Sequence, residues 1–137
     1  MSKVLIDTNL LVYSVDRDSK YYERSSALME SDTLELVTSS KNIVELLVVL
    51  TKSRGYNLTS QLALEIVSAI SSRATIIYPN YKSITLLRDL VKKYEPKGLR
   101  IHDMEIIAIS LAYDINLIAT LNIKDFSTVT EIDLLEL

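Results

Sequence analysis

Short apolar runs alternate along the chain with longer stretches in which apolar residues recur every three or four positions. A short continuous apolar run is typical of a strand buried on both faces, and the longer period is typical of an amphipathic helix. Strands are therefore predicted over 4–6, 34–38, 74–78 and 117–120, with a short fifth strand near 128–129. Helices are predicted over 20–31, 42–54, 60–72, 81–94 and 104–113.

The alternation of strands and helices predicts an α/β domain built around a largely parallel sheet of four to five strands. The chain has 137 residues with only two glycines and two prolines, so short connections are expected. Gly55 is expected to end the helix over 42–54, and Glu95-Pro96-Lys97-Gly98 is the clearest loop. We expect residues 1–137 to form a single domain.

Composition narrows the possible chemistry to carboxylates. The chain has no cysteine and one histidine, but 18 Asp and Glu residues. Disulfides, thiol catalysis and cysteine-ligated or multi-histidine metal sites are excluded. With a net charge of −3, the chain as a whole lacks the excess of Lys and Arg that is typical of nucleic-acid-binding proteins. With no long apolar run and no signal-like start, a soluble cytoplasmic protein is expected.

Several acids fall where parallel strands end, which is where open α/β sheets bind ligands. Asp7 directly follows the first strand, and Glu45 lies in the helix after the second. Asp103 opens the apolar helix that leads to the fourth strand, while Asn122 and Asp125 follow that strand. The topology predicts that these side chains meet at one rim of the sheet.

Each acid also has a purely structural explanation. Asp7 could cap a turn, and Asp103 could be a helix N-cap. Asn42 and Glu45 have the spacing of a capping box, although Glu45 has apolar neighbours that disfavour an unpaired charge. Asp125 could be a turn residue.

A cluster of four carboxylates needs a cation. Two unit charges ~5 Å apart repel by about 3 kcal/mol at an effective dielectric constant of ~20. An oxygen-only site favours a hard ion, Mg²⁺ or Mn²⁺. Such ions bind phosphates and generate a nucleophilic hydroxide at neutral pH, which indicates phosphodiester hydrolysis.

Three segments resemble the PIN domain family. They are Val4-Leu5-Ile6-Asp7-Thr8-Asn9, Ile101-His102-Asp103, and Ala119-Thr120-Leu121-Asn122-Ile123-Lys124-Asp125-Phe126. The order of the acids and the length are similar to the VapC-like ribonuclease toxins of toxin–antitoxin pairs. The resemblance covers essentially the whole chain. It implies a three-layer α/β/α fold, a metal-dependent endoribonuclease, a homodimer and an antitoxin protein that holds it inactive.

The resemblance also assigns roles to individual residues. It implies that the catalytic acids and metal ligands are Asp7, Glu45, Asp103 and Asp125. It implies that Asn9 orients the acids and that Thr8 and Thr120 support them by hydrogen bonds. Some family members carry an acid where this chain has Asn122, whose amide offers an oxygen but no charge.

An RNA substrate would need basic residues around a negative site. The candidates are Lys41, Lys52, Arg54, Lys97 and Arg100, each of which could equally be ordinary surface. Tyr13 and Tyr56 could stack on bases or pack in the core. His102 adjoins Asp103, but a metal-hydroxide mechanism needs no imidazole, so a structural role is expected for it.

Two other interpretations remain open at this stage. The first is a catalytically silent PIN-like module that binds RNA or a partner protein, against which the retention of all four acids argues. The second is a phosphoaspartate protein, such as a receiver domain or a haloacid-dehalogenase-like phosphatase. The segment Asp7-Thr8-Asn9 lacks the second acid that such a phosphatase requires.

Overall fold

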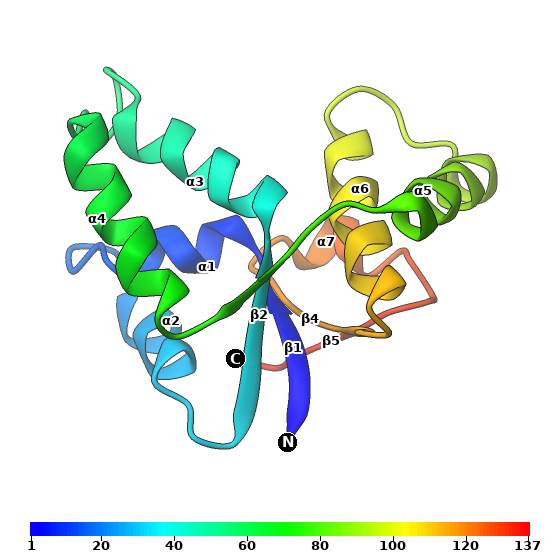
Figure 1. Ribbon diagram of the computed structural model, residues 1–137, viewed down its shortest axis with the longest axis horizontal. Coiled ribbons are helices and arrows are strands. Elements are labelled where there is room, and N and C mark those ends of the chain that lie inside the picture. The colour runs from blue at the N-terminus through cyan, green and yellow to red at the C-terminus, as the bar shows by residue number, and fades with distance from the viewer.

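The protein forms a five-stranded parallel sheet between two layers of helices (Figure 1). The computed structural model describes residues 1–137. Its strands, in chain order, are β1 (Ser2–Ile6), β2 (Leu34–Ser39), β3 (Thr75–Ile77), β4 (Leu117–Ala119) and β5 (Asp133–Leu134). All neighbouring strands are parallel, in the spatial order β3-β2-β1-β4-β5.

The helices are divided between the two faces of the sheet. Four helices cover one face: α1 (Thr8–Tyr13), α2 (Tyr22–Met29), α3 (Ser40–Thr51) and α4 (Ser60–Ser71). Three cover the other: α5 (Tyr81–Tyr94), α6 (Arg100–Ala112) and α7 (Ile123–Phe126). The predicted three-layer α/β/α fold with a parallel sheet is therefore confirmed.

The apolar runs are continuous because each central strand contributes to two cores. Val4 and Ile6 of β1 pack with the helices of the first layer, whereas Leu5 between them packs with the helices of the second. All three side chains are fully buried. A strand with helices on both faces has no side for polar residues, as the sequence pattern predicted.

The strand order reverses beside β1, and this reversal determines where a site can form. The chain proceeds from β1 to β2 and β3 on one side, and then returns across the sheet to β4 on the other. Connections therefore leave the carboxyl ends of β1 and β4 in opposite directions, which opens a crevice between them. Asp7 follows β1 and Thr120 follows β4 at this point.

Several predicted boundaries are wrong. The fifth strand is Asp133–Leu134 rather than 128–129, because Val129 lies in a turn in which its N–H bonds to the carbonyl of Phe126 and its side chain is buried. The helix expected to end at Gly55 ends at Thr51, since Lys52 already has an extended ψ of 126°. Helices α1 and α7 were not predicted, because six and four residues are too few to show a helical period.

None of the helices combines the length and the apolar character needed to cross a membrane.

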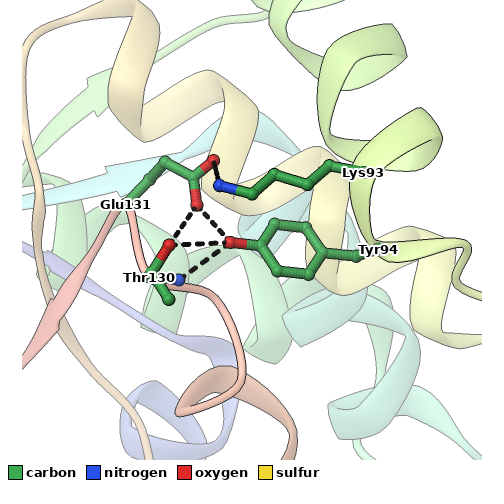
Figure 2. A network of polar contacts seen from close by, with 4 residues as sticks. All are labelled: Lys93, Tyr94, Thr130 and Glu131. Carbon is green, nitrogen blue, oxygen red and sulfur yellow. Dashed lines mark hydrogen bonds and ion pairs between the residues drawn. The ribbon is translucent and has the colours of Figure 1, made fainter.

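A polar network attaches the end of α5 to the segment before β5 (Figure 2). The Tyr94 hydroxyl donates to the Glu131 carboxylate and accepts from the backbone N–H of Thr130 at 2.9 Å. Lys93 donates to the other Glu131 oxygen at 3.2 Å. Burial alone would raise the pKa of Glu131, but the hydrogen bonds from Tyr94 and Lys93 outweigh it and lower that pKa below its usual value. The network stabilises the edge of the sheet.

We predict that Tyr94→Phe lowers the free energy of unfolding by about 1 to 2 kcal/mol, because it removes a donor to a charged acceptor and leaves the Thr130 N–H without its partner. The lowered pKa means that the charged form of Glu131 stabilises the fold above pH 4.5 and that this contribution is lost as the pH falls through the folded-state value. The effect of the substitution should therefore shrink in acid. Urea unfolding at pH 7 and pH 3.5 measures both quantities.

Tyr81→Phe is the matched control for this measurement. Tyr81 lies on the same helix, is 90% exposed and donates no side-chain hydrogen bond, so its substitution should leave the free energy of unfolding unchanged. An equal effect of the two substitutions would show that the Tyr94 network contributes nothing to stability.

Candidate active site

A cavity of about 350 Å³ lies at the carboxyl end of β1, beside the point where the strand order reverses. Its polar lining, the polar wall, consists of Asp7, Thr8, Asn9, Glu45, Asp103 and Asn122. These residues come from four parts of the chain: the start of α1, the middle of α3, the first turns of α6 and the segment after β4. The structure thus brings together three of the four predicted acids, with Asn9, Thr8 and Asn122.

Asp7 is the most constrained of these acids. Its carboxylate is 7% exposed, and its backbone N–H extends the sheet by bonding to the carbonyl of Ala119 at 2.9 Å. Oδ2 accepts the Thr120 hydroxyl at 2.7 Å, and Oδ1 accepts the Thr8 N–H at 2.8 Å. Burial raises the pKa of Asp7, and these hydrogen bonds and a third from Asn42 only partly offset that effect, to which the charge of Glu45 adds.

Both explanations offered for Asp7 are compatible with this geometry. Asp7 is the N-cap of α1, and its side chain accepts from Thr8. The capping contact uses Oδ1, while Asp7 also lines the cavity. Capping therefore positions the carboxylate at the cavity and leaves it part of the polar wall.

Asn42 is a connecting residue that the sequence analysis did not select. It is fully buried, and its amide nitrogen donates to Thr8 Oγ1 at 3.0 Å and to Asp7 Oδ1 at 3.3 Å. Thr8 in turn donates its hydroxyl to Glu45 Oε2 at 2.8 Å. One amide therefore holds two acid-bearing segments, the start of α1 and the first turns of α3, in a fixed relation.

The capping box that starts α3 differs from the predicted one. Ser39 is the N-cap and Asn42 is its N3 partner, with Ser39 Oγ 2.5 Å from Asn42 Oδ1. The suggested pairing of Asn42 with Glu45 is wrong, because the helix begins three residues earlier than that pairing requires. A capping box usually has Glu or Gln at N3, so the spacing Ser-x-x-Asn after a strand is too weak a signal to identify Asn42 from the sequence.

The segment after β4 also holds the Asp7 carboxylate in place. Thr120 is 1% exposed, and its hydroxyl donates to Asp7 and accepts from the backbone N–H of Asn122 at 3.0 Å. Asn9 donates to both Asp7 and Thr120 at 3.5 Å and accepts the Leu121 N–H at 3.3 Å. Asn9 therefore contacts both strand ends, as an orienting residue would.

Asp103 is an acid whose protonation is strongly affected by the site. Its pKa is raised to about 6, first by burial and then by the negative charges of Asp7, Asp125 and Glu45, which Arg100 only partly offsets. The suggestion that Asp103 is a helix N-cap is wrong, since α6 begins at Arg100 and Leu99 occupies that position. The carboxylate is left free to face the cavity.

Asp125 lies farther from the cavity than predicted. Its Oδ1 is 3.9 Å from Arg100 Nε, and its Oδ2 accepts the side-chain amide of Asn122 at 3.1 Å. It belongs to the one-turn helix α7 and does not line the cavity, whereas Asn122 does. Its charge still reaches Asp103, which places all four acids in one electrostatic neighbourhood.

None of the five predicted basic residues lines the cavity. Lys41 pairs with Glu105 at 3.4 Å, and Arg100 pairs with Asp125. Lys52, Arg54 and Lys97 are exposed, the first two after α3 and the third before α6. In Figure 1 the connection after α3 lies at the upper left and the connection before α6 lies at the upper right. His102 is exposed and does not line the cavity, so it stays outside the polar wall.

The polar wall fits a hard divalent cation in its donor chemistry. It offers carboxylate oxygens and the amide oxygens of Asn9 and Asn122. The raised pKa of Asp103 reflects burial and, after it, repulsion by neighbouring carboxylates that a cation would relieve. No three acids are close enough together to form a complete ligand group by themselves. An ion here would therefore keep several of its waters, as Mg²⁺ usually does in proteins.

Comparison with known proteins identifies the family. A sequence model of the PIN domain matches residues 4–132. The chain belongs to the PIN domain family. The resemblance seen in the sequence is thereby confirmed, and the match of this PIN domain includes all four acids. No curated protein sequence matches the chain at a significant level.

Solved structures share the fold of this PIN domain. VapBC2 from Rickettsia felis, bound to a promoter DNA fragment, matches with a TM-score of 0.75 and 21% identity, over 96% of each chain. VapBC-1 from nontypeable Haemophilus influenzae matches with a TM-score of 0.69 and 23% identity, over 98% and 97%. VapC20 from Mycobacterium tuberculosis, a sarcin-ricin loop cleaving toxin, matches with a TM-score of 0.71 and 10% identity, over 91% and 94%.

The raised pKa of Asp103 predicts that Asp103→Asn stabilises the metal-free protein at pH 7. Because the folded-state value of about 6 lies above the ordinary 3.8, the folded protein binds more protons in this interval. Stability should therefore fall as the pH rises from 3.8 to 6 and stay low above it. We expect a gain of roughly 1 kcal/mol at pH 7, after allowing for solvent screening, and none near pH 3.5.

Urea unfolding in EDTA across this pH range measures the difference between the two proteins. Asp89→Asn, which removes an exposed acid from α5, is the control and should show no such pH dependence. A destabilised Asp103→Asn at pH 7 would contradict the picture of four mutually repelling acids.

Proposed function

We propose that this PIN domain protein is a Mg²⁺- or Mn²⁺-dependent endoribonuclease, and that it is a VapC-like toxin neutralised by an antitoxin protein. One observation carries the proposal. Carboxylates of Asp7, Glu45 and Asp103, from segments far apart in the chain, line one cavity at the switch point of the sheet. Burying like charges together is costly, and a divalent cation offsets that cost. A cation held by carboxylates in turn binds and activates a phosphodiester substrate.

The residues of the polar wall have different roles in this proposal. Asp7 and Asp103 would hold the ion, with Asn122 offering an amide oxygen and Asp125 adding negative charge from behind. A bound divalent ion supplies an acidified water and an electrophile for the phosphate oxygens. Glu45, held by Thr8, would accept a hydrogen bond from the attacking water and orient it. Thr120 and Asn9 hold the Asp7 carboxylate in place by hydrogen bonds, and the bond from Thr120 partly offsets the rise in the Asp7 pKa that burial causes.

The role of the fourth acid, Asp125, rests on its contacts outside the cavity. Asp125 pairs with Arg100 and does not line the cavity, so we propose that it acts through its charge and through its hydrogen bond with Asn122. Arg100, Lys41, Lys52, Arg54 and Lys97 remain the proposed contacts for the RNA backbone. The exposed positions of Lys52 and Lys97 next to α3 and α6, the helices that carry Glu45 and Asp103, support this role.

The proposed antitoxin and dimer have separate support. Structures with this fold include VapBC complexes and a toxin–antitoxin complex from Klebsiella pneumoniae. The first helical layer also exposes apolar side chains on its outer surface: Val44 and Val48 of α3 are 58% and 54% exposed, and Leu62 and Leu64 of α4 are 48% and 55% exposed. Partner proteins, including a second copy, would cover such a surface. A cytoplasmic location and a single domain over 1–137 complete the proposal.

The proposal predicts Mn²⁺-dependent cleavage of RNA that requires Asp7 and Asp103. Asp7→Asn and Asp103→Asn keep the shape of the side chain but remove its charge, and each should lower the cleavage rate by at least roughly 100-fold, since both the ion and the phosphate lose their support. Purified protein is incubated with structured and single-stranded RNAs, and the products are separated on denaturing gels.

Asp89→Asn, an exposed acid on α5, is the matched control and should cleave as the unmodified protein does. EDTA should abolish cleavage by both. Cleavage that persists in EDTA and in the two variants would contradict a metal-dependent nuclease that uses these acids. Cleavage that never occurs with any RNA would favour a silent binding module.

A further inference from the structure

The cavity also has lining residues whose chemistry differs from that of the acids. They are Val12, Tyr13, Val49 and Tyr56, and the two tyrosines form its aromatic wall. They come from the end of α1, the end of α3 and the segment that follows α3. A Mg²⁺ ion with six waters, at about 30 Å³ per water, would fill roughly half of the 350 Å³. The remaining space borders the apolar and aromatic side chains.

Tyr56 is exposed but held in place. Its side chain is 38% exposed, so core packing does not account for it. Its hydroxyl donates to Asp16 Oδ2 at 2.5 Å, which joins the segment after α3 to the segment after α1. Burial and this hydrogen bond raise the pKa of Tyr56 to about 12, so the hydroxyl remains a donor at neutral pH. The ring is fixed before any ligand arrives, which lowers the entropy cost of stacking on it.

The backbone that carries Tyr56 is also fixed. The N–H groups of Gly55 and Asn57 both bond to the carbonyl of Lys52 at 3.0 Å, and the N–H of Leu58 bonds to the carbonyl of Leu50 at 2.9 Å. These bonds fold the segment back on the end of α3. An aromatic residue on such a turn is held at the mouth of the cavity by both its backbone and its hydroxyl.

Tyr13 extends the aromatic wall to a positively charged surface. Its ring centroid is 5.2 Å from that of Tyr21, with the planes tilted by 41°. Lys20 and Arg24 lie over the Tyr21 ring at 5.1 and 5.6 Å from its centroid. Lys20 and Arg24 do not line the cavity, but they carry positive charge next to the tyrosine that packs on Tyr13, where they would attract a phosphate that flanks the one at the acids.

We propose that the wall formed by Tyr13 and Tyr56 is a stacking subsite for one unpaired nucleobase of an RNA substrate, next to the phosphate held at the acids. The inference rests on the proposed nuclease function and adds to it a contact with one base beside the phosphate. In an A-form duplex every base is stacked between its neighbours, so no base face is open to a tyrosine. The base that binds here is therefore unpaired, in a single strand or in a loop. Stacking needs only a base face, so this subsite accepts any of the four bases.

A binding experiment tests this without relying on cleavage. The probe is a seven-nucleotide RNA with a central 2-aminopurine, whose fluorescence falls when the base stacks. It is titrated with Asp103→Asn protein in Mn²⁺, so that the RNA stays intact. Replacing Tyr56 by Leu should weaken binding by about 5- to 100-fold and abolish the quenching, because stacking contributes on this scale. Tyr56→Phe, which keeps the ring, should retain most of both.

The controls distinguish the loss of the aromatic ring from a loss of the folded structure. Tyr81→Leu, which removes a 90% exposed tyrosine from α5, should bind as the Asp103→Asn background does. Circular dichroism should show the same unfolding midpoint for the Leu and Phe variants of Tyr56. A duplex of the same sequence should compete at least about 10-fold less well than the single strand. In an otherwise unmodified chain, Tyr56→Leu should raise KM for cleavage with little change in kcat.

The subsite is overturned if the Asp103→Asn protein gives no quenching, if Tyr56→Leu binds and quenches as its parent does, or if duplex RNA competes equally. These results are distinct from failure of the nuclease proposal, which is absence of Mn²⁺-dependent cleavage by the unmodified chain. Quenching that depends on Tyr56 in a chain that does not cleave would retain the stacking subsite and remove only the catalytic step.

Discussion

The hydrogen bond between Asp7 and Thr120 joins the carboxyl ends of the two strands on either side of the switch point, and the rest of the site is arranged around it. At 2.7 Å it holds a buried carboxylate beside β4 while the backbone of Asp7 extends the sheet. Without this partner a carboxylate that is 7% exposed would lose much of the stabilisation of its charge. Fold and site are coupled at this contact, because the residue that ends β1 also begins α1.

The remaining acids face a constraint of the opposite kind. Asp7 accepts hydrogen bonds from several donors, whereas Asp103 is half-buried near three carboxylates and one guanidinium, and burial and these charges raise its pKa to about 6. Arg100 pairs with Asp125, which does not line the cavity. The protein therefore keeps part of its acidic charge unbalanced at the cavity. That imbalance costs stability in the free protein, and in the proposed function it would favour the binding of a cation.

Sequence patterns located the strands and three cavity acids for the same physical reason. A strand covered on both faces must be apolar throughout, and the first polar residue after it must lie at the rim of the sheet, which identifies Asp7. Asn42 and the Tyr56–Asp16 contact could not be found in this way. Both depend on segments that meet only in the folded chain, and an asparagine at N3 lies outside the usual capping pattern. The sequence pattern also could not show that Asp125 pairs with Arg100 and does not line the cavity, because Arg100 lies on a separate helix.

The central claim is that acids from separate segments form one binding site for a divalent cation. Calorimetric titration of the metal-free protein with Mn²⁺ tests it most directly. The account predicts saturable binding that is weakened by at least about 10-fold in Asp7→Asn and in Asp103→Asn, because each is proposed to hold the ion. Binding by Asp89→Asn should be unchanged. Equal affinity in all four proteins, or no binding by the unmodified chain, would contradict the account.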